Sequence, residues 1–470
     1  MVTPSMNTRL ATYLLRSTVV LLGLGQGQCG EPLLVLDIDS ASVPAATTKF
    51  LLRPQLDGKD GNEVWFTGDK RRLAVYLPKG SSGPLSADLY AMDETERIIA
   101  QKSISEQVPG GISGSQVTSV SLTPLAVPRN SYSSLTLSAA LMTDFSASWG
   151  SDPQNVYVAG YAGAIARCSS ASNVCTSLDL SALPAPLPNF KSVWGSDSSN
   201  VYAVGDFGGI IRCDGSGKCI SLTSPNLNIA YQSVWGSDAG HVYVVGNSNM
   251  IQLCSSGSPV CTQLTYRSAN GNSPDFSSVW GSDLNHVYIA GSSGTMVVCS
   301  AEPQGCNLLS SGTQSNLKTV WGSDANNVYA AGSGTIVRCS SASTTCTVLT
   351  PPKAATSTTF YAIWGSDAHN VYVVGDNSFG GVVLRCSSDS NSCAELTASP
   401  SRALRSVWGS DADNVYVVDS LGSVRRCSAG SNICAPLSTG FPQRVNAVWG
   451  VNRDNIYMVG SAGSIVRRRL

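Results

Sequence analysis

The sequence predicts an all-β chain whose larger part is a β-propeller, and three observations lead to this fold class. First, a Trp-Gly phrase occurs at eight places: Trp149, Trp194, Trp235, Trp280, Trp321, Trp364, Trp408 and Trp449. Second, successive copies are 41 to 45 residues apart, and a repeat of that length made of short strand-like runs is typical of propeller blades. Third, the 45 glycines and the abundant Ser, Thr, Val and Asn suit a chain of strands and turns.

The first element expected is an export signal over residues 1–28. Its basic start is followed by an apolar stretch at 17–25, which is too short to span a bilayer. Cys29 follows and is a candidate bacterial lipid anchor, although the residue before a lipidated Cys is normally small and here is Gln28. Plain secretion, lipidation at Cys29 and the absence of a signal all stay open.

The second element is a small domain over residues 31–127, which lack the repeat. Short alternating apolar runs are separated there by turn signals such as DGKDG and PKGSSGP. This pattern predicts a β-sandwich of about seven strands, immunoglobulin-like in the loose sense. Trp65 is expected in its core, and the Pro- and Ser-containing stretch at 123–134 is expected to be a linker.

Each repeat is predicted to form a four-stranded blade. In the second copy the first three strands are FKSVW (190–194), NVYAV (200–204) and GIIRC (209–213), and the fourth strand of a repeat follows its second Cys. Asp and Asn side chains hold the GSDxxN turn by bonding to their own backbone. The recurrent Trp and Tyr supply the large apolar area that packs neighbouring blades. We expect the first strand to be innermost and the fourth outermost.

The cysteines form local pairs within the repeats. Of 15 cysteines, all but Cys29 fall into seven pairs: Cys168 with Cys175, Cys213 with Cys219, Cys254 with Cys261, Cys299 with Cys306, Cys339 with Cys346, Cys386 with Cys393, and Cys427 with Cys434. Each pair flanks a polar turn, which predicts a hairpin closed by a disulfide. Metal binding is the rival interpretation, but no repeat offers more than two thiolates. Disulfides in such number predict export to the periplasm, the outer-membrane surface or the medium.

The two ends of the repeat array are expected to meet in one composite blade. The last repeat stops after its third strand at 465–470, and the segment 133–138 resembles a fourth strand without a first three. In this composite blade Tyr132 and Arg468 occupy the two Cys positions. Closing the ring removes exposed sheet edges. We therefore predict an eight-bladed β-propeller over residues 130–470, with a seven-bladed ring as the runner-up.

The phrase VWGSDxxNVYVVGxxGxIxRC resembles the WG-type repeats of exported proteins and lipoproteins of myxobacteria and related Gram-negative bacteria. It is also similar to propellers with BNR-like and photosystem-assembly-factor-like repeats. The resemblance covers residues 130–470 and implies a propeller fold and an extracytoplasmic location, with no particular activity. The S-x-D-x-G-x-T-W box of sialidase-type repeats is absent from the sequence, so glycosidase catalysis is not carried over.

Residues suited to catalysis or metal binding occur in this sequence mainly within turns. The three histidines, His241, His286 and His369, all follow a GSD triplet. The repeated turn acids are Asp152, Asp197, Asp238, Asp283, Asp324, Asp367 and Asp411, with Asn452 in the eighth copy. Calcium needs several oxygens converging on one ion, whereas these acids are spread one per blade, so turn capping is the stronger interpretation. No nucleophile, zinc or phosphate motif occurs in a usable context, and no catalytic residue, metal or cofactor is predicted.

The loops predict one uniform face and one variable face. The GSD turns and Cys hairpins share the first, and connectors that differ widely between repeats share the second; differentiated loops suit recognition. Three residues before Trp, a mostly polar position is expected to ring the channel mouth on the variable face. It holds Lys191, Gln232, Ser277, Lys318, Tyr361, Arg405 and Asn446. All but Ser277 are candidate ligand-binding residues for a small anion or a sugar; a solvated channel lining is the other interpretation.

The function expected is that of an exported, non-enzymatic binding or scaffolding protein, a monomer that binds a protein or a glycan through the variable face. The net charge of −1 gives no reason to expect nucleic acid, and a membrane would be reached only through Cys29. One alternative is a polysaccharide hydrolase or lyase acting through acids in the channel. The other is a purely structural surface protein.

Overall fold

The structure is a computed structural model, and it describes most of the chain. The described residues are 18–20, 32–57, 59–60, 63–76, 83–94, 97–108, 116–130, 132–138, 143–222, 228–266, 273–301, 304–352, 355, 357–396, 402–437 and 443–468. Two compact units are found: Met1–Ser131 with Ser438–Gly440, and Tyr132–Leu437 with Phe441–Leu470. Cys29 and all of the expected signal except 18–20 lie outside the described residues. A helix long and apolar enough to cross a membrane is not found in the described part of the chain.

The first unit consists of two sheets with a common core. One has the order β1 (Thr18–Val20), β6 (Arg72–Tyr76), β2 (Pro32–Ile38), β9 (Gln116–Val120); the other has the order β10 (Thr123–Asn130), β8 (Arg97–Val108), β7 (Gly83–Met92), β3 (Lys49–Leu56), β4 (Lys59–Asp60), with β5 (Val64–Thr67) also on β3. Leu36 and Leu73 from the first sheet and Phe50 and Leu89 from the second belong to one buried cluster. The sheets therefore pack face to face over an apolar layer.

Two expectations for this unit are wrong. Trp65 is only half-buried, whereas its neighbours Val64 and Phe66 pack against the core. Because side chains alternate along a strand, the indole lies on the opposite face of β5. The stretch expected to be a linker begins with a strand, since β10 pairs with β8. Both prolines of β10, at its second and sixth residues, are tolerated because β10 is an edge strand.

The second unit is a series of sheets, each built mainly of antiparallel strands that follow one another in chain order. Their strands are β13 (Phe145–Asp152), β14 (Asn155–Gly160), β15 (Ile165–Ser169), β16 (Val174–Ser177); β17 (Phe190–Asp197), β18 (Asn200–Gly205), β19 (Ile210–Cys213), β20 (Cys219–Ser221); β21 (Tyr231–Asp238), β22 (His241–Gly246), β23 (Met250–Cys254), β24 (Thr262–Leu264); β25 (Phe276–Asp283), β26 (His286–Gly291), β27 (Met296–Ala301), β28 (Gln304–Leu309); β29 (Leu317–Asp324), β30 (Asn327–Gly332), β31 (Ile336–Cys339), β32 (Thr347–Val348); β33 (Thr359–Asp367), β34 (Asn370–Asn377), β35 (Gly380–Ser387), β36 (Ser392–Glu395); β37 (Leu404–Asp411), β38 (Asn414–Asp419), β39 (Val424–Ser428), β40 (Ile433–Leu437); and β41 (Val445–Asn452), β42 (Asn455–Gly460), β43 (Ile465–Arg468).

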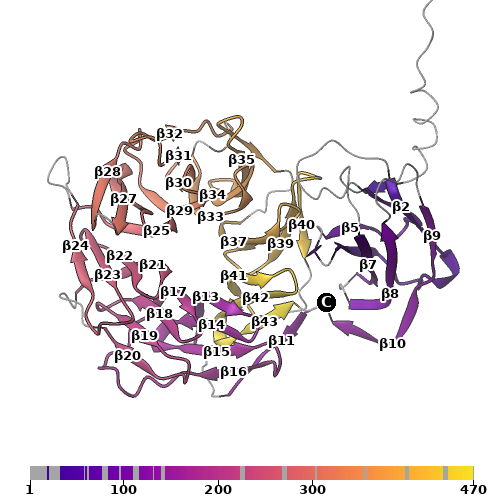
Figure 1. Ribbon diagram of the computed structural model, residues 1–470, viewed down its shortest axis with the longest axis horizontal. Helices are drawn as coiled ribbons and strands as arrows, with labels where there is room; N and C mark the ends of the chain where they lie inside the picture. The colour runs from indigo at the N-terminus through magenta and orange to yellow at the C-terminus, as the bar shows by residue number, and fades with distance from the viewer. Residues whose placement is uncertain are drawn as a thin grey trace, which may run out of the picture. The chain divides into compact units, whose positions relative to one another are not determined.

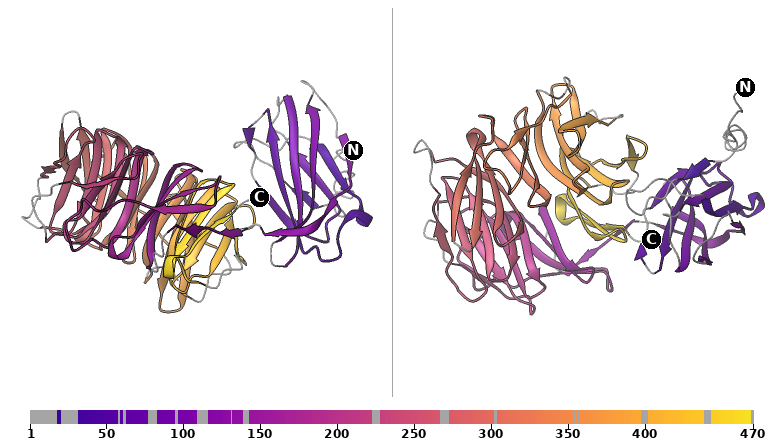
Figure 2. Two further views of the ribbon diagram at one scale, coloured as in Figure 1. Left: turned by 90° about the horizontal axis from the view of Figure 1, so that it is seen from below. Right: turned by 45° about the horizontal axis from the view of Figure 1, so that its top comes forward.

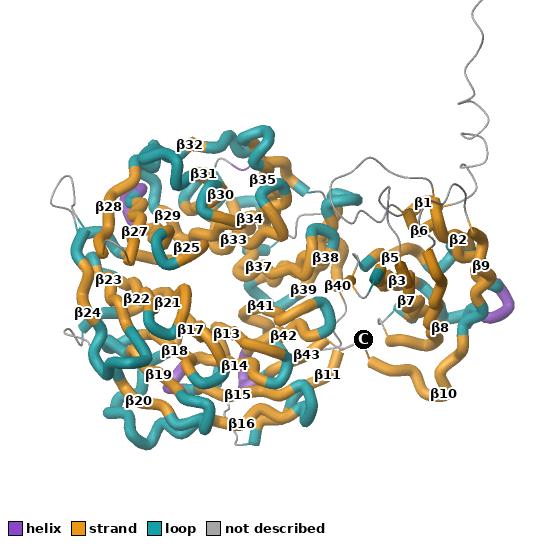
Figure 3. The backbone as a smooth tube through the Cα atoms, viewed as in Figure 1, coloured by secondary structure: helices purple, strands orange, loops and turns teal. Residues whose placement is uncertain are grey.

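These sheets follow one another around a centre, with the first strand of each sheet innermost (Figure 1). Each innermost strand packs on the next, and β41 of the last sheet packs on β13 of the first. Side views show the sheets of this unit packed face to face (Figure 2). Strands and loops make up almost all of the trace (Figure 3). Within the described ranges the short 3-10 helices are η2 (Ser40–Ser42), η3 (Tyr161–Gly163), η4 (Ser292–Gly294) and η6 (Ser461–Gly463).

The Trp-Gly phrase is explained by a contact between neighbouring sheets. The indole of Trp149 lies against Gly195 of the next sheet, where an added Cβ would be 2.6 Å from a ring carbon. The same contact joins Trp280 to Gly322. Trp449 of the last sheet lies against Gly150 of the first, so the contact continues around the ring. The glycine is needed because each indole occupies the place of a side chain on the next sheet.

The ends of the second unit are joined by two short strands. β11 (Tyr132–Ser134) pairs antiparallel with β43, and Tyr132 lies opposite Arg468. β12 (Thr136–Leu137) then pairs in parallel with β16 of the first sheet. The segment 133–138, expected to be one outer strand, is therefore divided between the last and the first sheets.

The seven predicted disulfides are confirmed, with every cysteine bonded to its expected partner. The bonds join Cys168 to Cys175, Cys213 to Cys219, Cys254 to Cys261, Cys299 to Cys306, Cys339 to Cys346, Cys386 to Cys393, and Cys427 to Cys434. Their Cα–Cα distances are 3.9 to 4.3 Å. Each bond joins the third strand of a sheet to the fourth strand or to the residue just before it, on either side of a polar turn. Multiple disulfides fit an extracellular or periplasmic protein, where the environment is oxidising.

Candidate functional site

The candidate binding residues share one backbone position, a β-bulge in the innermost strand. In β17, Phe190 lies opposite Gly205 and Ser192 opposite Val204, so Lys191 between them has no partner on β18. The same shift occurs at Ser146, Gln232, Ser277, Lys318, Tyr361, Arg405 and Asn446. A bulge leaves its extra residue outside the ladder and redirects the side chain. The bulge lies at the connector end of each innermost strand.

Several of these side chains are engaged locally. Lys191 Nζ lies 2.7 Å from Asp206 Oδ1, so its charge is neutralised within its own sheet. Asn446 Nδ2 donates to the Phe145 carbonyl at 3.0 Å. Gln232 Nε2 donates to the Ala230 carbonyl at 3.4 Å. These three residues therefore make contacts typical of a structural role, and the structure does not bring all six candidates together.

Lys318, Tyr361 and Arg405, on three successive sheets, do come together. Lys318 Nζ lies 4.9 Å from the centre of the Tyr361 ring, and the Arg405 guanidinium carbon lies 4.0 Å from the same centre. Both distances are within the range of cation–π attraction. Both cationic residues are exposed, and neither pairs with a carboxylate in the described part of the chain. We call these residues the 318–361–405 cluster.

A cavity on the same connector face was missed by the sequence analysis. It has a volume of about 670 Å³ and is lined by Tyr266, the Ser292–Gly294 turn and the connector 310–314. Hydroxyl and backbone groups dominate this lining, and Ser311 is buried within it. The sequence contains little sign of this cavity, because the connector segment SSGTQ (310–314) has the composition of an ordinary polar loop.

The repeated acids have the geometry of turn caps. Asp197 Oδ1 accepts the Ser199 amide at 2.7 Å and Asn200 Nδ2 at 3.1 Å. Burial alone would raise the pKa of Asp197, but hydrogen bonds from Ser196, Asn200 and the Ser199 amide lower it by more. In the eighth turn Asn452 Oδ1 accepts the corresponding amide at 3.0 Å. A neutral side chain therefore serves the same cap.

Two of the three histidines continue this pattern. Nδ1 of His241 and of His286 lies 3.0 Å and 2.9 Å from the turn carboxylates of Asp238 and Asp283. His369 Nδ1 lies 3.1 Å from Asp389 Oδ2. A cluster of three or more His, Cys, Asp or Glu that could hold a metal is not found among the described residues.

The closed series of sheets and the indole contacts between them define this unit as a β-propeller. A scan against protein-family models and a search of curated proteins found no match. Solved structures do match in fold. The designed protein Ika8 has a TM-score of 0.57 at 15% identity, covering 72% of this chain and 100% of its own. The C-terminal WD40 domain of Sif2 has a TM-score of 0.54 at 15% identity, covering 71% and 99%. A catalytically inactive virginiamycin B lyase from Staphylococcus aureus with quinupristin has a TM-score of 0.48 at 11% identity, covering 72% and 99%.

Proposed function

We propose that this chain is an exported, non-enzymatic binding protein that presents the connector face of a propeller to a protein partner. The proposal includes an eight-bladed ring over residues 130–470 and a β-sandwich over residues 31–127. The sheets with β13, β17, β21, β25, β29, β33, β37 and β41 innermost support this number of blades. A signal over residues 1–28 would export the chain, and the disulfides support an oxidising destination.

The 318–361–405 cluster is the observation that carries the proposed activity. Two cations on one aromatic ring are held in place by that ring and keep their hydrogen-bond donors free for a ligand. A guanidinium binds a carboxylate through two parallel hydrogen bonds, and a nearby ammonium adds charge. The cluster therefore suits an acidic side chain or a chain terminus of a partner protein. The bulge positions carry no acid, which favours binding over the acid-dependent hydrolase or lyase mechanism.

An anisotropy titration with a fluorescent hexaglutamate peptide tests this proposal. We expect the double variant K318A/R405A to bind the peptide at least tenfold more weakly than the native chain, because it lacks both donors. Lys191→Ala is the matched control, since that ammonium is already paired with Asp206. Its affinity should stay within twofold of the native value.

A second probe separates a protein partner from a glycan. Oligogalacturonate offers carboxylates on a sugar backbone in place of a peptide. If it binds tenfold more tightly than the peptide and depends on the same residues, the protein-partner proposal is wrong. Equal peptide binding by the K318A/R405A variant and the native chain would remove the cluster from the proposal.

A further inference from the structure

An arginine joins most neighbouring sheets on the face that carries the GSD turns and the disulfides. It lies on the third strand, opposite the repeated Tyr of the second strand. The pairs are Tyr157 with Arg167, Tyr202 with Arg212, Tyr329 with Arg338, Tyr372 with Arg385, Tyr416 with Arg426, and Tyr457 with Arg467. The guanidinium of five of them donates to a backbone carbonyl of the next sheet: Arg167 to Gly215, Arg212 to Ser256, Arg338 to Ser388, Arg385 to Ala429 and Arg467 to Ser170. Each acceptor is the second residue after the first Cys of its hairpin.

Val298 interrupts this arrangement. Val298, on β27, lies opposite Tyr288 of β26, at the position where six other sheets have arginine. The matching acceptor in the next sheet is the carbonyl of Ser341, two residues after Cys339. Valine has no donor to offer, and no hydrogen bond to this carbonyl is found among the residues that the structure describes. Leu253, opposite Tyr243, is the second exception.

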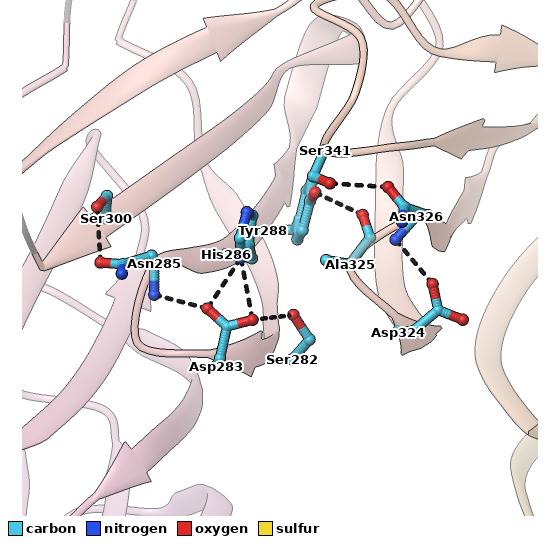
Figure 4. A network of polar contacts seen from close by, with 10 residues as sticks. All are labelled: Ser282, Asp283, Asn285, His286, Tyr288, Ser300, Asp324, Ala325, Asn326 and Ser341. Atoms are coloured by element: carbon cyan, nitrogen blue, oxygen red, sulfur yellow. Dashed lines mark hydrogen bonds and ion pairs between the residues drawn. The ribbon is translucent and has the colours of Figure 1, made fainter.

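A cavity lies where the missing arginine would be. It has a volume of about 380 Å³ and is lined by His286, Tyr288, Val298, Leu308 and the hairpin turn 340–344. Figure 4 shows His286 and Tyr288 on one side of this interface and Ser341 on the other. The volume is at the small end of the range for ligand sites. The cavity therefore suits one side chain better than a folded segment.

The charges around the cavity favour a cation. Burial and, to a smaller degree, the carboxylates of Asp283 and Asp324 together raise the pKa of Tyr288 to about 12. At Tyr157 two turn carboxylates act in the same direction, but Arg167 opposes them. No Lys or Arg is among the described residues that line the cavity at Val298. The interface between the sheets of β25 and β29 therefore has the turn carboxylates of the repeat but lacks the arginine that accompanies them in most other sheets.

We propose that this cavity binds an arginine side chain presented by a partner protein. The guanidinium donates to the Ser341 carbonyl beside the Tyr288 ring, as five of the resident arginines do at their own interfaces. The aliphatic stem of the guest packs against Val298 and Leu308, both of which line the cavity. The site is on the face opposite the 318–361–405 cluster, so it goes beyond the proposed function and does not depend on it.

Isothermal titration of the full chain with N-acetyl-arginine amide tests the proposal. We expect saturable binding of one molecule per chain, at least tenfold weaker for N-acetyl-citrulline amide, which has the same shape without the charge. The variant Val298→Arg fills the cavity with a resident arginine and should weaken binding at least tenfold. Leu253→Arg is the matched control, because it makes the same change at the other exceptional interface. It should leave the affinity within twofold of the native value.

Several results would overturn this inference. If Val298→Arg bound N-acetyl-arginine amide with native affinity, the guanidinium would bind elsewhere. Loss of binding in Leu253→Arg instead would lead to the same conclusion. The absence of saturable binding to the native chain would exclude the site. Free arginine binding tenfold more tightly than the blocked amide would point to an amino-acid site and not to a protein-borne side chain. The K318A/R405A variant should bind the amide normally, so failure of this site and failure of the proposed function are separable.

Discussion

At the residue scale, the Trp-Gly phrase describes two partners in one contact. The indole of each sheet rests on the glycine of the next, as Trp280 does on Gly322. The sequence predicted that Trp packs neighbouring blades, but the receiving glycine was not recognised. The two residues are adjacent in the chain but make contacts on opposite sides of their sheet. The Trp packs on the next sheet, and the Gly receives the Trp of the preceding sheet.

Gly322→Ala should destabilise the fold by about 1–3 kcal/mol, the usual cost of forcing extra volume into a packed site. An added Cβ would lie 2.5 Å from the Trp280 ring. Chemical denaturation at neutral pH measures the change. Gly305→Ala is the control, because nothing lies within 4 Å of a Cβ at that position. Equal effects of the two substitutions would show that the indole contact is not the cause.

At the element scale, the turn acids make stability depend on pH. Hydrogen bonds lower the folded-state pKa of Asp324 below its ordinary value of 3.8, despite the opposing effect of burial. The same direction holds for Asp152, Asp197, Asp238, Asp283 and Asp367. A lowered folded-state pKa adds stability that is present above the unfolded-state pKa and is lost as the pH falls through the folded-state pKa. The free energy of unfolding should therefore drop below about pH 4.

Asp324→Asn should reduce that acid-induced loss, because an amide does not titrate in this range. The native Asn452 shows that Asn can accept the amide two residues on and the next Asn side chain, both at 3.0 Å. Urea unfolding at neutral pH and near pH 3 measures the difference. Asn452→Asp is the reciprocal variant and should increase the acid sensitivity. A steeper loss in Asp324→Asn would contradict the turn-cap interpretation.

The bulge is the second feature of this scale. It gives each innermost strand one side chain outside the ladder, at a position that the sequence had singled out by its polarity. The polar character of the bulge positions did not indicate which of their side chains contact one another. Lys191 is neutralised by Asp206, while Lys318 and Arg405 share the Tyr361 ring. The outcome depends on which residues the neighbouring sheets supply.

At the scale of the whole molecule, the ring is closed without a covalent bond. Tyr132 and Arg468 lie opposite each other on β11 and β43, the position that a disulfide occupies in the other sheets. Arg468 is buried, and its guanidinium donates to the Arg453 carbonyl at 3.1 Å. Closure therefore rests on strand pairing and packing at the two ends of the unit.

The double variant Y132C/R468C should form an eighth disulfide and be more stable than Y132S/R468S by about 2–4 kcal/mol, the typical contribution of such a bond. Thermal unfolding without reductant measures the gain, and intact mass shows the bond. The variant Y132S/R468S is the control, since it loses the same native contacts without forming a bond. Failure of the two cysteines to pair would contradict the observed register of β11 against β43.

The sequence by itself determined the repeat, the order of strands within each sheet and the seven disulfides. These features depend on local patterns: alternation along a strand, turn residues and short spacing between cysteines. Only the tertiary structure decided that Trp65 leaves the core, that Tyr361 lies between two cations, and that Val298 leaves a cavity beside Tyr288. The physical reason is that each of these features depends on a partner in another strand or sheet. The sequence of one repeat determines the fold of its own sheet, but it does not show which side chains the neighbouring sheet places against it.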